Sequence, residues 1–395
     1  MASRNKPQEQ QGASLTSIAW KQFRKHPLAR ISLVVLSILY LLAAFADFIA
    51  PYPERQINTK LTFQPPTKIH FRSEEGSLTR PYICKTSKEI DFTTFEEVWT
   101  EDCKQRLDIK FFVHREGVNG IERYVPFPVN LIPLPIRQQV GIKPWASLHL
   151  FGVEDPQDKV RIFLWGSDDL GSDVFGKTLF GARISLTIGI IGTFVALLIG
   201  LIMGGIAGYF GGWIDEIIMR AVEALSAIPT IFLLLALAAV FYPLNWPSTY
   251  VFTAVIVVLA LIGWGSSARS VRGLVYSIKE QEFAIAAKSL GASNWRIITQ
   301  HILPQTLSFA IVTMSLSIPG YILAESVLSF YGLGIQPPST SWGLMLSTAQ
   351  RFAGVTGLTE RWWIFLPGLF IFISVLTWNL LGDGLRDAFD PRQRK

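Results

Sequence analysis

The sequence predicts an all-α polytopic membrane protein with six transmembrane helices and one long polar insertion. Half of its 395 residues are hydrophobic and only 17% are charged, against the roughly 25% that is usual in soluble domains. The apolar residues stand in long uninterrupted runs, and the mean hydropathy of the chain is +0.34. A soluble fold could not bury so many such runs, so the composition indicates a membrane protein.

Six apolar segments are each close to the ~20 residues that a helix needs to cross the hydrocarbon layer. The segments are Ile31–Phe48, Ile184–Tyr209, Ala221–Tyr242, Val251–Ala268, Ser308–Tyr331 and Trp362–Leu381. The third is the least regular, because Arg220 and Glu223 stand at its start and Pro229 is expected to kink it. The first could be a cleaved signal peptide, but its apolar run exceeds the usual ~7–15 residues, so we expect an uncleaved anchor.

Lysine and arginine in the short flanks of the spans predict the orientation. They concentrate before the first span, between the fourth and fifth spans, and after the sixth. An even number of spans places these regions on one side, which is therefore expected to be cytoplasmic, both termini included. The predicted division is a cytoplasmic segment 1–30, a first span 31–50, an extracytoplasmic insertion 51–180, a transmembrane domain 181–385 and a cytoplasmic tail 386–395.

The net charge of +6 could suggest a nucleic-acid partner. The basic residues lie beside apolar segments, however, which favours anionic lipid headgroups as their partner and excludes nucleic acid from the expected function.

The insertion is expected to be mostly β or irregular, since it contains short β-prone runs punctuated by proline and glycine. Examples are KFFVH at Lys110–His114 and ERYVP at Glu122–Pro126. Both cysteines of the chain, Cys84 and Cys103, fall within it. Outside the cytoplasm, two cysteines in one small domain favour a disulfide over two free thiols.

A polar stretch between two apolar runs, Glu282–Pro304, is the most informative part of the chain. Ser277 with Glu280 three residues later predicts a capping box that starts a helix. Gly291 can adopt the left-handed conformation that ends this helix, and Ser293 can cap a second one. The stretch therefore predicts a helix–glycine–helix hairpin.

The second helix of this hairpin should be amphipathic, with Trp295, Ile298 and Ile302 on one face. Such a face has nowhere in its own loop to be buried, so we expect it to dock on a partner. The alternative is a hairpin that lies on the membrane surface.

One short motif points elsewhere. GSDVFGKT at Gly171–Thr178 matches the phosphate-loop pattern GxxxxGK[ST]. A membrane span begins at Ile184, so no α/β domain follows the motif, and its side of the membrane is the outer one, where ATP is absent. We interpret the match as chance.

No catalytic or metal-binding motif is evident, so we expect no enzyme. The five histidines, His26, His70, His114, His149 and His301, are scattered along the chain. Within the spans, Glu325 is the main ionisable residue. A carboxylate in the membrane is costly, so Glu325 should line a translocation pathway or contact a partner, unless it lies near the outer headgroups.

Several longer motifs occur in a fixed order. They are Trp165–Gly189 (WGSDDLGSDVFGKTLFGARISLTIG), Gly208–Arg220 (GYFGGWIDEIIMR), Ile322–Leu346 (ILAESVLSFYGLGIQPPSTSWGLML) and Gly382–Pro391 (GDGLRDAFDP). Together with the hairpin stretch they closely resemble the permease subunits, of the C type, of dipeptide/oligopeptide/nickel ABC importers. The resemblance runs from about Phe163 to the C-terminus and also covers Phe23–Pro53. Ile285 departs from it, because the wider superfamily often has glutamate there.

The resemblance implies a type I, MetI-like permease core in the inner membrane of a prokaryote. It implies that 277–304 is the ATPase-coupling loop, which contains Glu282 and has Ala286, Ala287 and Gly291 at signature positions and Pro304 at its close. The implied partners are a second homologous permease, two ABC ATPase subunits and an extracytoplasmic substrate-binding protein. ATP and Mg would be bound by the ATPases, so no cofactor is expected in this chain.

The resemblance leaves the substrate open, since peptides are the usual cargo but nickel, glutathione and other small solutes occur. Two other classes stay open as well. An ion-driven secondary transporter should show internal repeats and paired charges at the midplane, and the sequence shows neither. A membrane-anchored receptor would not need six spans.

Overall fold

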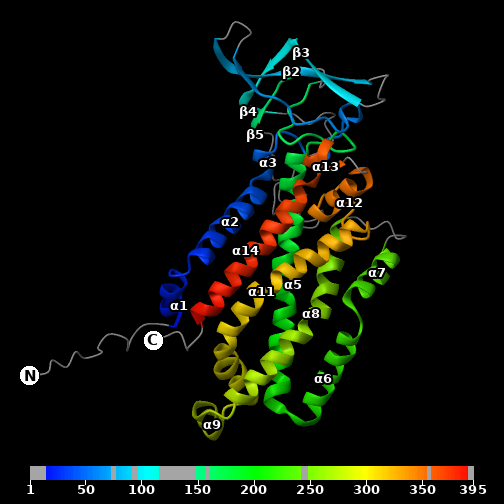
Figure 1. The fold of residues 1–395 in the computed structure, drawn as a ribbon. Coiled ribbons are helices and arrows are strands. Elements are labelled where there is room, and N and C mark those ends of the chain that lie inside the picture. The colour runs from blue at the N-terminus through cyan, green and yellow to red at the C-terminus, as the bar shows by residue number, and fades with distance from the viewer. Residues whose placement is uncertain are drawn as a thin grey trace, which may run out of the picture.

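A single helical bundle runs through the molecule, with two small sheets at one end and a helical hairpin at the other (Figure 1). We call these the sheet end and the hairpin end. The structure is a computed structural model that describes residues 15–72, 77–90, 97–114, 148–155, 160–241, 248–353 and 357–389. The ERYVP run, the first 14 residues and residues 390–395 of the predicted tail lie outside these ranges.

Successive long helices run alternately toward the sheet end and toward the hairpin end (Figure 1). The first group is α1 (Leu15–Phe23), α2 (Pro27–Ala44), α3 (Ala46–Ile49), α5 (Val174–Phe210), α6 (Gly212–Ala227), α7 (Thr230–Phe241) and α8 (Ser248–Ile278). The second group is α9 (Glu282–Ser289), α10 (Asn294–Arg296), α11 (Leu307–Phe330), α12 (Trp342–Ala353), α13 (Gly357–Glu360) and α14 (Leu366–Phe389). A π-helical turn at Ile297–Ile302 and a 3₁₀ turn at Leu303–Thr306 join α10 to α11.

Within the described ranges, five continuous helical segments are long and apolar enough to cross a membrane. They are Pro27–Ala44, Val174–Phe210, Tyr250–Ile278, Asn294–Phe330 and Trp362–Phe389. The predicted third span, Ala221–Tyr242, is divided between α6 and α7, with the break at the proline that was expected to kink it. Ile228 adopts an extended conformation between them, as expected for a residue before a proline, here Pro229.

The second span begins earlier than the sequence suggested, so the predicted insertion ends inside α5. The Asp173 carboxylate accepts hydrogen bonds from Phe175 N–H at 3.2 Å and Gly176 N–H at 2.9 Å. These contacts satisfy donors that a helix start otherwise leaves without partners, and they fix the first residue of α5 at Val174.

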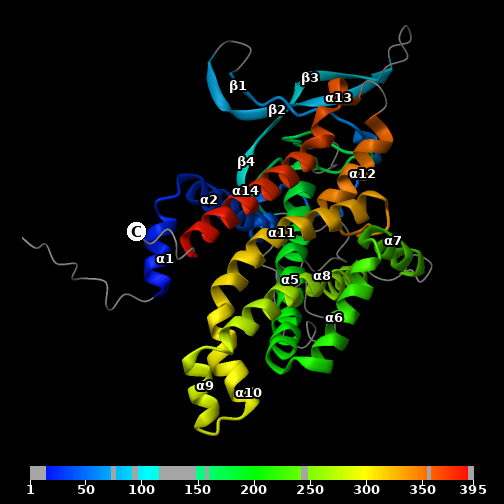
Figure 2. The ribbon, with the colours of Figure 1, turned by 60° about the horizontal axis from the view of Figure 1, so that its bottom comes forward.

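Helix α5 lies at the centre of the bundle, with α8 against one side and α11 against another (Figures 1 and 2). A stripe of glycines lets α5 and α8 approach closely. A Cβ on Gly204 would lie 2.5 Å from the Ala268 carbonyl oxygen, and a Cβ on Gly208 would lie 2.8 Å from that of Arg272. These glycines therefore serve helix packing.

A buried ion pair fastens α5 to the first span. The Arg183 guanidinium donates to both carboxylate oxygens of Asp47, at 3.2 and 2.7 Å, and to the carbonyl oxygens of Ala43 and Ala44. These carbonyls end α2, so Arg183 also stabilises the C-terminus of that helix.

The insertion contains five described strands, in agreement with its predicted β character. Strands β1 (His70–Arg72), β2 (Leu78–Ile90) and β3 (Glu97–Asp108) form an antiparallel sheet in that order, and β4 (Lys110–His114) pairs with β5 (Leu148–Gly152). The KFFVH run is therefore a strand. A core that includes Ile83, Ile162 and Phe163 lies beneath the strands, and a disulfide joins Cys84 to Cys103.

Candidate functional site

The hairpin end is formed by α9, α10 and the turns that follow them. Gly291 has a φ of +81° between the two helices, and a Cβ there would meet nothing within 4 Å. The need for glycine is therefore conformational rather than one of space. The Ser293 hydroxyl accepts from Arg296 N–H at 3.4 Å, which caps α10 as predicted.

Two local predictions for the hairpin are wrong. Ser277 does not begin α9, because it lies in the last turn of α8, and the residue that precedes α9 is Gln281, whose side chain makes no capping bond. Ile298 and Ile302 are buried, whereas the Trp295 side chain is exposed. The π-helical turn has more residues per turn than an α-helix and so rotates Trp295 away from the isoleucines.

The hairpin is held firmly against the bundle. The Tyr209 hydroxyl at the end of α5 donates to Asn294 Oδ1 at 2.9 Å. Lys279 Nζ donates to the Gly208 carbonyl oxygen at 3.0 Å, and Ile297 and Ile302 pack in a buried cluster with side chains of α8. A displacement of α9 would therefore be transmitted to α5 and α8.

Large apolar side chains are exposed on the outer surface of the hairpin. Leu290 is 88% exposed, and Ile285 and Trp295 are each more than half exposed. The signature residues lie among them: Glu282, Ala286 and Pro304 are exposed, while Ala287 is partly buried against the α8 cluster. Apolar groups on a hairpin of small residues form a surface suited to a protein groove.

An ion pair that the sequence analysis missed joins α8 to α6 near the hairpin. The Arg272 guanidinium makes two hydrogen bonds to the Asp215 carboxylate, both at 2.5 Å. The Tyr276 hydroxyl donates to the same carboxylate at 3.3 Å, and its ring lies under Arg272. Only the fold brings these groups together, because they are 57 residues apart in the chain.

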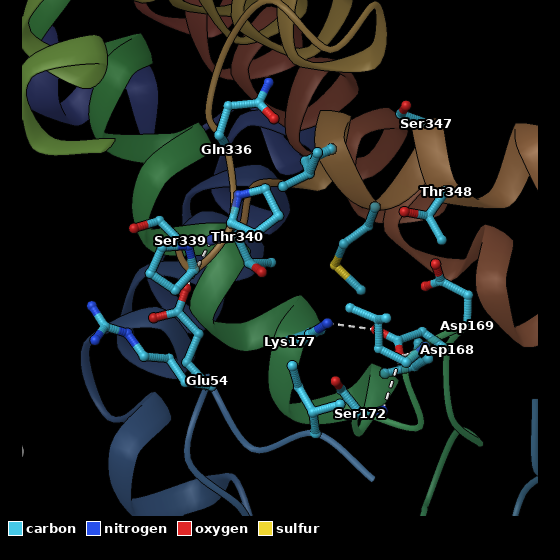
Figure 3. Close-up of a pocket in the computed structure, with 18 of the residues that line it drawn as sticks. Glu54, Asp168, Asp169, Ser172, Lys177, Gln336, Ser339, Thr340, Ser347 and Thr348 are labelled. Carbon is cyan, nitrogen blue, oxygen red and sulfur yellow. Dashed lines mark hydrogen bonds and ion pairs between the residues drawn. The ribbon is translucent and has the colours of Figure 1, made fainter. Parts of the chain in front are cut away.

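A cavity of about 570 Å³ opens at the sheet end, where the start of α5 meets α12 and the loop before α12. Figure 3 shows Glu54, Asp168, Lys177, Gln336 and Thr348 around it. Its volume is that of a small-ligand site. The lining contains both acidic and basic side chains, so it can contact positively and negatively charged groups of a ligand.

The groups that a phosphate-loop pattern would offer to a phosphate are already paired with carboxylates. Lys177 Nζ, the lysine of the pattern, is paired with Asp168 Oδ2 at 2.5 Å. The N–H groups of Phe175 and Gly176, at the helix start where a phosphate would bind, donate to Asp173. A phosphate group would have to displace both carboxylates.

Burial perturbs two carboxyl groups at this end. Burial raises the pKa of Glu54 from 4.5 to about 7, although a hydrogen bond from Thr340 N–H and the charge of Arg183 oppose it. Burial likewise raises the pKa of Asp173 to about 7, against the hydrogen bonds from Gly176 and Phe175. Both groups can therefore exchange a proton near neutral pH.

The side chain of Glu325 on α11 is buried. Its Oε2 accepts from Ser185 Oγ at 2.9 Å and its Oε1 from Ser329 Oγ at 2.7 Å. Each hydroxyl in turn accepts a backbone N–H, from Trp342 at 3.3 Å and Ile335 at 3.1 Å respectively. In this conformation Glu325 thus holds the loop before α12 through the hydroxyls of Ser185 and Ser329.

Known proteins match most of the bundle. The family model described as the binding-protein-dependent transport system inner membrane component matches residues 196–395. The model of the N-terminal TM domain of oligopeptide transport permease C matches residues 14–66. The crystal structure of an amino acid ABC transporter with histidines matches 53% of this chain and 92% of its own, at 18% identity and a TM-score of 0.37.

Three curated relatives are similar to more than half of this chain. The dipeptide transport system permease protein DppC of Bacillus subtilis (strain 168) is 44% identical over 232 residues, which are 58% of this chain and 69% of the relative. The oligopeptide transport system permease protein OppC of the same organism is 40% identical over 252 residues, 64% and 78% of the two chains. The glutathione transport system permease protein GsiD of Pectobacterium atrosepticum is 40% identical over 227 residues, 58% and 72%. The chain therefore belongs to the family of binding-protein-dependent transport system inner membrane components.

Proposed function

We propose that this chain is the membrane permease of an ATP-driven ABC importer for di- and oligopeptides. It pairs with a second homologous permease, receives peptides from an extracytoplasmic binding protein, and is driven by two separate ATPase subunits that bind ATP and Mg. The hairpin end and both termini then face the cytoplasm. The relatives support this cargo, because they are named for dipeptide, oligopeptide and glutathione transport, and glutathione is itself a short peptide.

The observation that carries the proposal is the exposed apolar surface of a hairpin that is fixed to two helices, α5 and α8. Leu290 and Ile285 are exposed on its outside, while the Tyr209–Asn294 and Lys279 contacts hold its inside to α5 and α8. A surface that only rested on lipid would not need such attachment. Closure of the ATPase pair would move α9 as a rigid body and carry α5 and α8 with it.

The same movement would reach α6 through the Asp215–Arg272 pair. It would reach the sheet end along α5, where Ser185 contacts Glu325. The loop that Glu325 positions lines the outer cavity. Glu325 would in this way couple ATPase closure to the mouth of the translocation pathway.

The test is co-purification and uptake with a matched pair of leucine variants. Leu290→Asp changes a residue that is 88% exposed at the hairpin end, and Leu78→Asp changes one that is 84% exposed at the sheet end. We expect Leu290→Asp to lose the ATPase subunits and ATP-dependent uptake of a labelled dipeptide in proteoliposomes, and Leu78→Asp to keep the ATPases.

A second variant tests the turn rather than the surface. Gly291→Val forces a β-branched residue to a φ of +81°, so ATP-dependent uptake should also be lost. Retention of the ATPases by Leu290→Asp would reject the docking role of the hairpin. Uptake that followed a proton gradient without ATP would favour a secondary transporter, and uptake of Ni²⁺ but not of peptides would reject the proposed cargo.

A further inference from the structure

The sheet end brings one histidine against the disulfide. The His70 ring nitrogen and the Cys84 and Cys103 sulfurs all lie within 4.8 Å of one another. The carboxylate of Glu101 is the nearest acidic group, with its Oε2 3.5 Å from His70 Nε2. Two sulfurs, one imidazole and one carboxylate are a ligand set that Zn²⁺ accepts.

The sheet register explains why these side chains meet. His70 in β1 lies opposite Tyr82 in β2, and the two rings stack with centroids 5.4 Å apart. Cys84 lies opposite Arg106, but the next residue, Lys85, lies opposite Asp102. The residues between these partners, Cys103 included, form a bulge in β3 that turns the Cys103 side chain toward Cys84.

His70 Nε2 is buried and has no hydrogen-bond partner among the described residues. Buried polar atoms without partners are rare in folded proteins, and each one requires an explanation. This nitrogen, whose contact with the Glu101 carboxylate at 3.5 Å does not meet hydrogen-bond geometry, has the lone pair or proton that a metal-binding imidazole uses. Since the His70 ring lies beside two sulfurs and a carboxylate, a metal ion is the explanation that fits all four groups.

We propose that the cluster of His70, Cys84, Cys103 and Glu101 is a Zn²⁺ site. It cannot bind the ion while the disulfide is intact, and it binds Zn²⁺ once the disulfide has been reduced. A dithiol reductant transfers two electrons and two protons to the Cys84–Cys103 bond and closes its own disulfide. Each cysteine thiol then releases a proton as its sulfur bonds to Zn²⁺. The protein thereby couples a redox change at the sheet end to metal binding.

The movement required is small. The two sulfurs are bonded in the disulfide and would separate to roughly 3.8 Å around a tetrahedral Zn²⁺ with Zn–S bonds of about 2.3 Å. Rotation of the cysteine side chains supplies this change. Glu101 can bind through Oε2, because its other oxygen, Oε1, lies 3.6 Å from Lys68 Nζ. Lys68 would then orient the ligand from outside the site.

The test uses the full-length chain in detergent and Co²⁺ as a spectroscopic substitute for Zn²⁺. A phosphine reduces the disulfide, becomes phosphine oxide with an oxygen from water, and adds no competing thiol. We expect the reduced protein to bind one Co²⁺, with a thiolate-to-cobalt charge-transfer band and the visible bands of a tetrahedral ion. The oxidised protein should show neither. Zn²⁺ should displace the Co²⁺ and slow alkylation of both cysteines.

Histidine variants distinguish this site from simple binding by two free thiols. His70→Ala keeps both cysteines and the disulfide but should weaken Co²⁺ binding after reduction by at least about tenfold. The matched control is His26→Ala, since His26 Nε2 also lies near a carboxylate, 3.7 Å from Asp387 Oδ2, but at the hairpin end. Equal affinity in His70→Ala and His26→Ala, or no tetrahedral spectrum in the reduced wild-type protein, would overturn the proposal.

Discussion

Ser185 on α5 donates a hydrogen bond to the Glu325 carboxylate on α11 inside the bundle, with 2.9 Å between Ser185 Oγ and Glu325 Oε2. The same hydroxyl accepts the Trp342 N–H, so one serine ties two helices and the start of α12. The carboxylate has hydroxyl donors rather than a cation as its described partners, since Ser329 and Ser326 complete the group. Removal of the carboxylate would leave buried donors without an acceptor.

Glu325→Ala should therefore destabilise the protein by on the order of 2–4 kcal/mol, because three buried serine hydroxyls lose their acceptor and a space opens. Glu325→Gln retains one acceptor oxygen and should cost less. Thermal unfolding of the detergent-solubilised chain measures both. Glu223→Ala is the control, since the Glu223 side chain is 61% exposed and its loss should change stability by less than ~0.5 kcal/mol. Similar losses for Glu325→Ala and Glu223→Ala would contradict the positioning role.

A double-mutant cycle on Arg272 and Asp215 should give a coupling free energy of about 1–3 kcal/mol, because the pair makes two hydrogen bonds and Asp215 is only 9% exposed. The exposed pair Arg220–Glu223 provides a matched control, with 73% and 61% of its side chains exposed. We expect less than ~0.5 kcal/mol for that pair. Equal coupling in the two cycles would show that the Arg272 pair does not join α6 to α8.

Gly204→Ala should destabilise the bundle by about 1–3 kcal/mol, since the new Cβ would lie 2.5 Å from the Ala268 carbonyl oxygen and push α5 away from α8. Gly273→Ala is the control on α8, where a Cβ would meet nothing within 4 Å. That change should be neutral or stabilising by up to about 1 kcal/mol, because alanine favours helix. Thermal unfolding of both variants checks the difference, and a neutral Gly204→Ala would rule out close α5–α8 packing.

The stability of the protein should fall as the pH rises from about 4.5 to 7, in part because of Glu54. In this range the folded protein keeps a proton on the buried Glu54 carboxyl, whose pKa is raised from 4.5 to about 7, while the unfolded chain has lost it. The folded state therefore binds more protons, and unfolding becomes easier with increasing pH. The shift corresponds to at most about 3 kcal/mol.

Glu54→Gln should remove this part of the pH dependence while its side-chain oxygen still accepts the Thr340 N–H bond. Melting temperatures measured between pH 4.5 and 7 would then decline less steeply than in the wild-type protein. Glu223→Gln, at the other end of the bundle, should leave the slope unchanged. An identical slope in Glu54→Gln would mean that Glu54 does not titrate in this range.

Local signals in the sequence predicted the hairpin well but misplaced one helix start. Gly291 and Ser293 act within a few residues of themselves, through a left-handed conformation and a single capping bond. The Ser277 capping box failed because Ser277 still belongs to α8, which ends at Ile278 and whose Val275 and Ile278 are buried against the hairpin. Packing of that last turn outweighs a cap whose contribution is only ~1 kcal/mol.

The buried polar groups could not be paired from the sequence. Glu325 and Ser185 are 140 residues apart, and Arg183 lies 136 residues from Asp47. The spacing of residues along the chain carries no information about such partners, because the register between two helices is set by the side chains packed between them. The approach of His70 to the cysteines depends in the same way on a bulge in β3.

The sequence by itself determined that the chain is a multi-span membrane protein, which segments are apolar, and where the hairpin turns. These features follow from the cost of placing polar backbone in hydrocarbon and from short-range conformational preferences. Tertiary structure alone decided which carboxylates are buried, where the cavity opens, and which histidine lies beside the disulfide. Those outcomes depend on contacts between residues that are far apart in the sequence. Such contacts form, and contribute to stability, only when the helices and strands pack together.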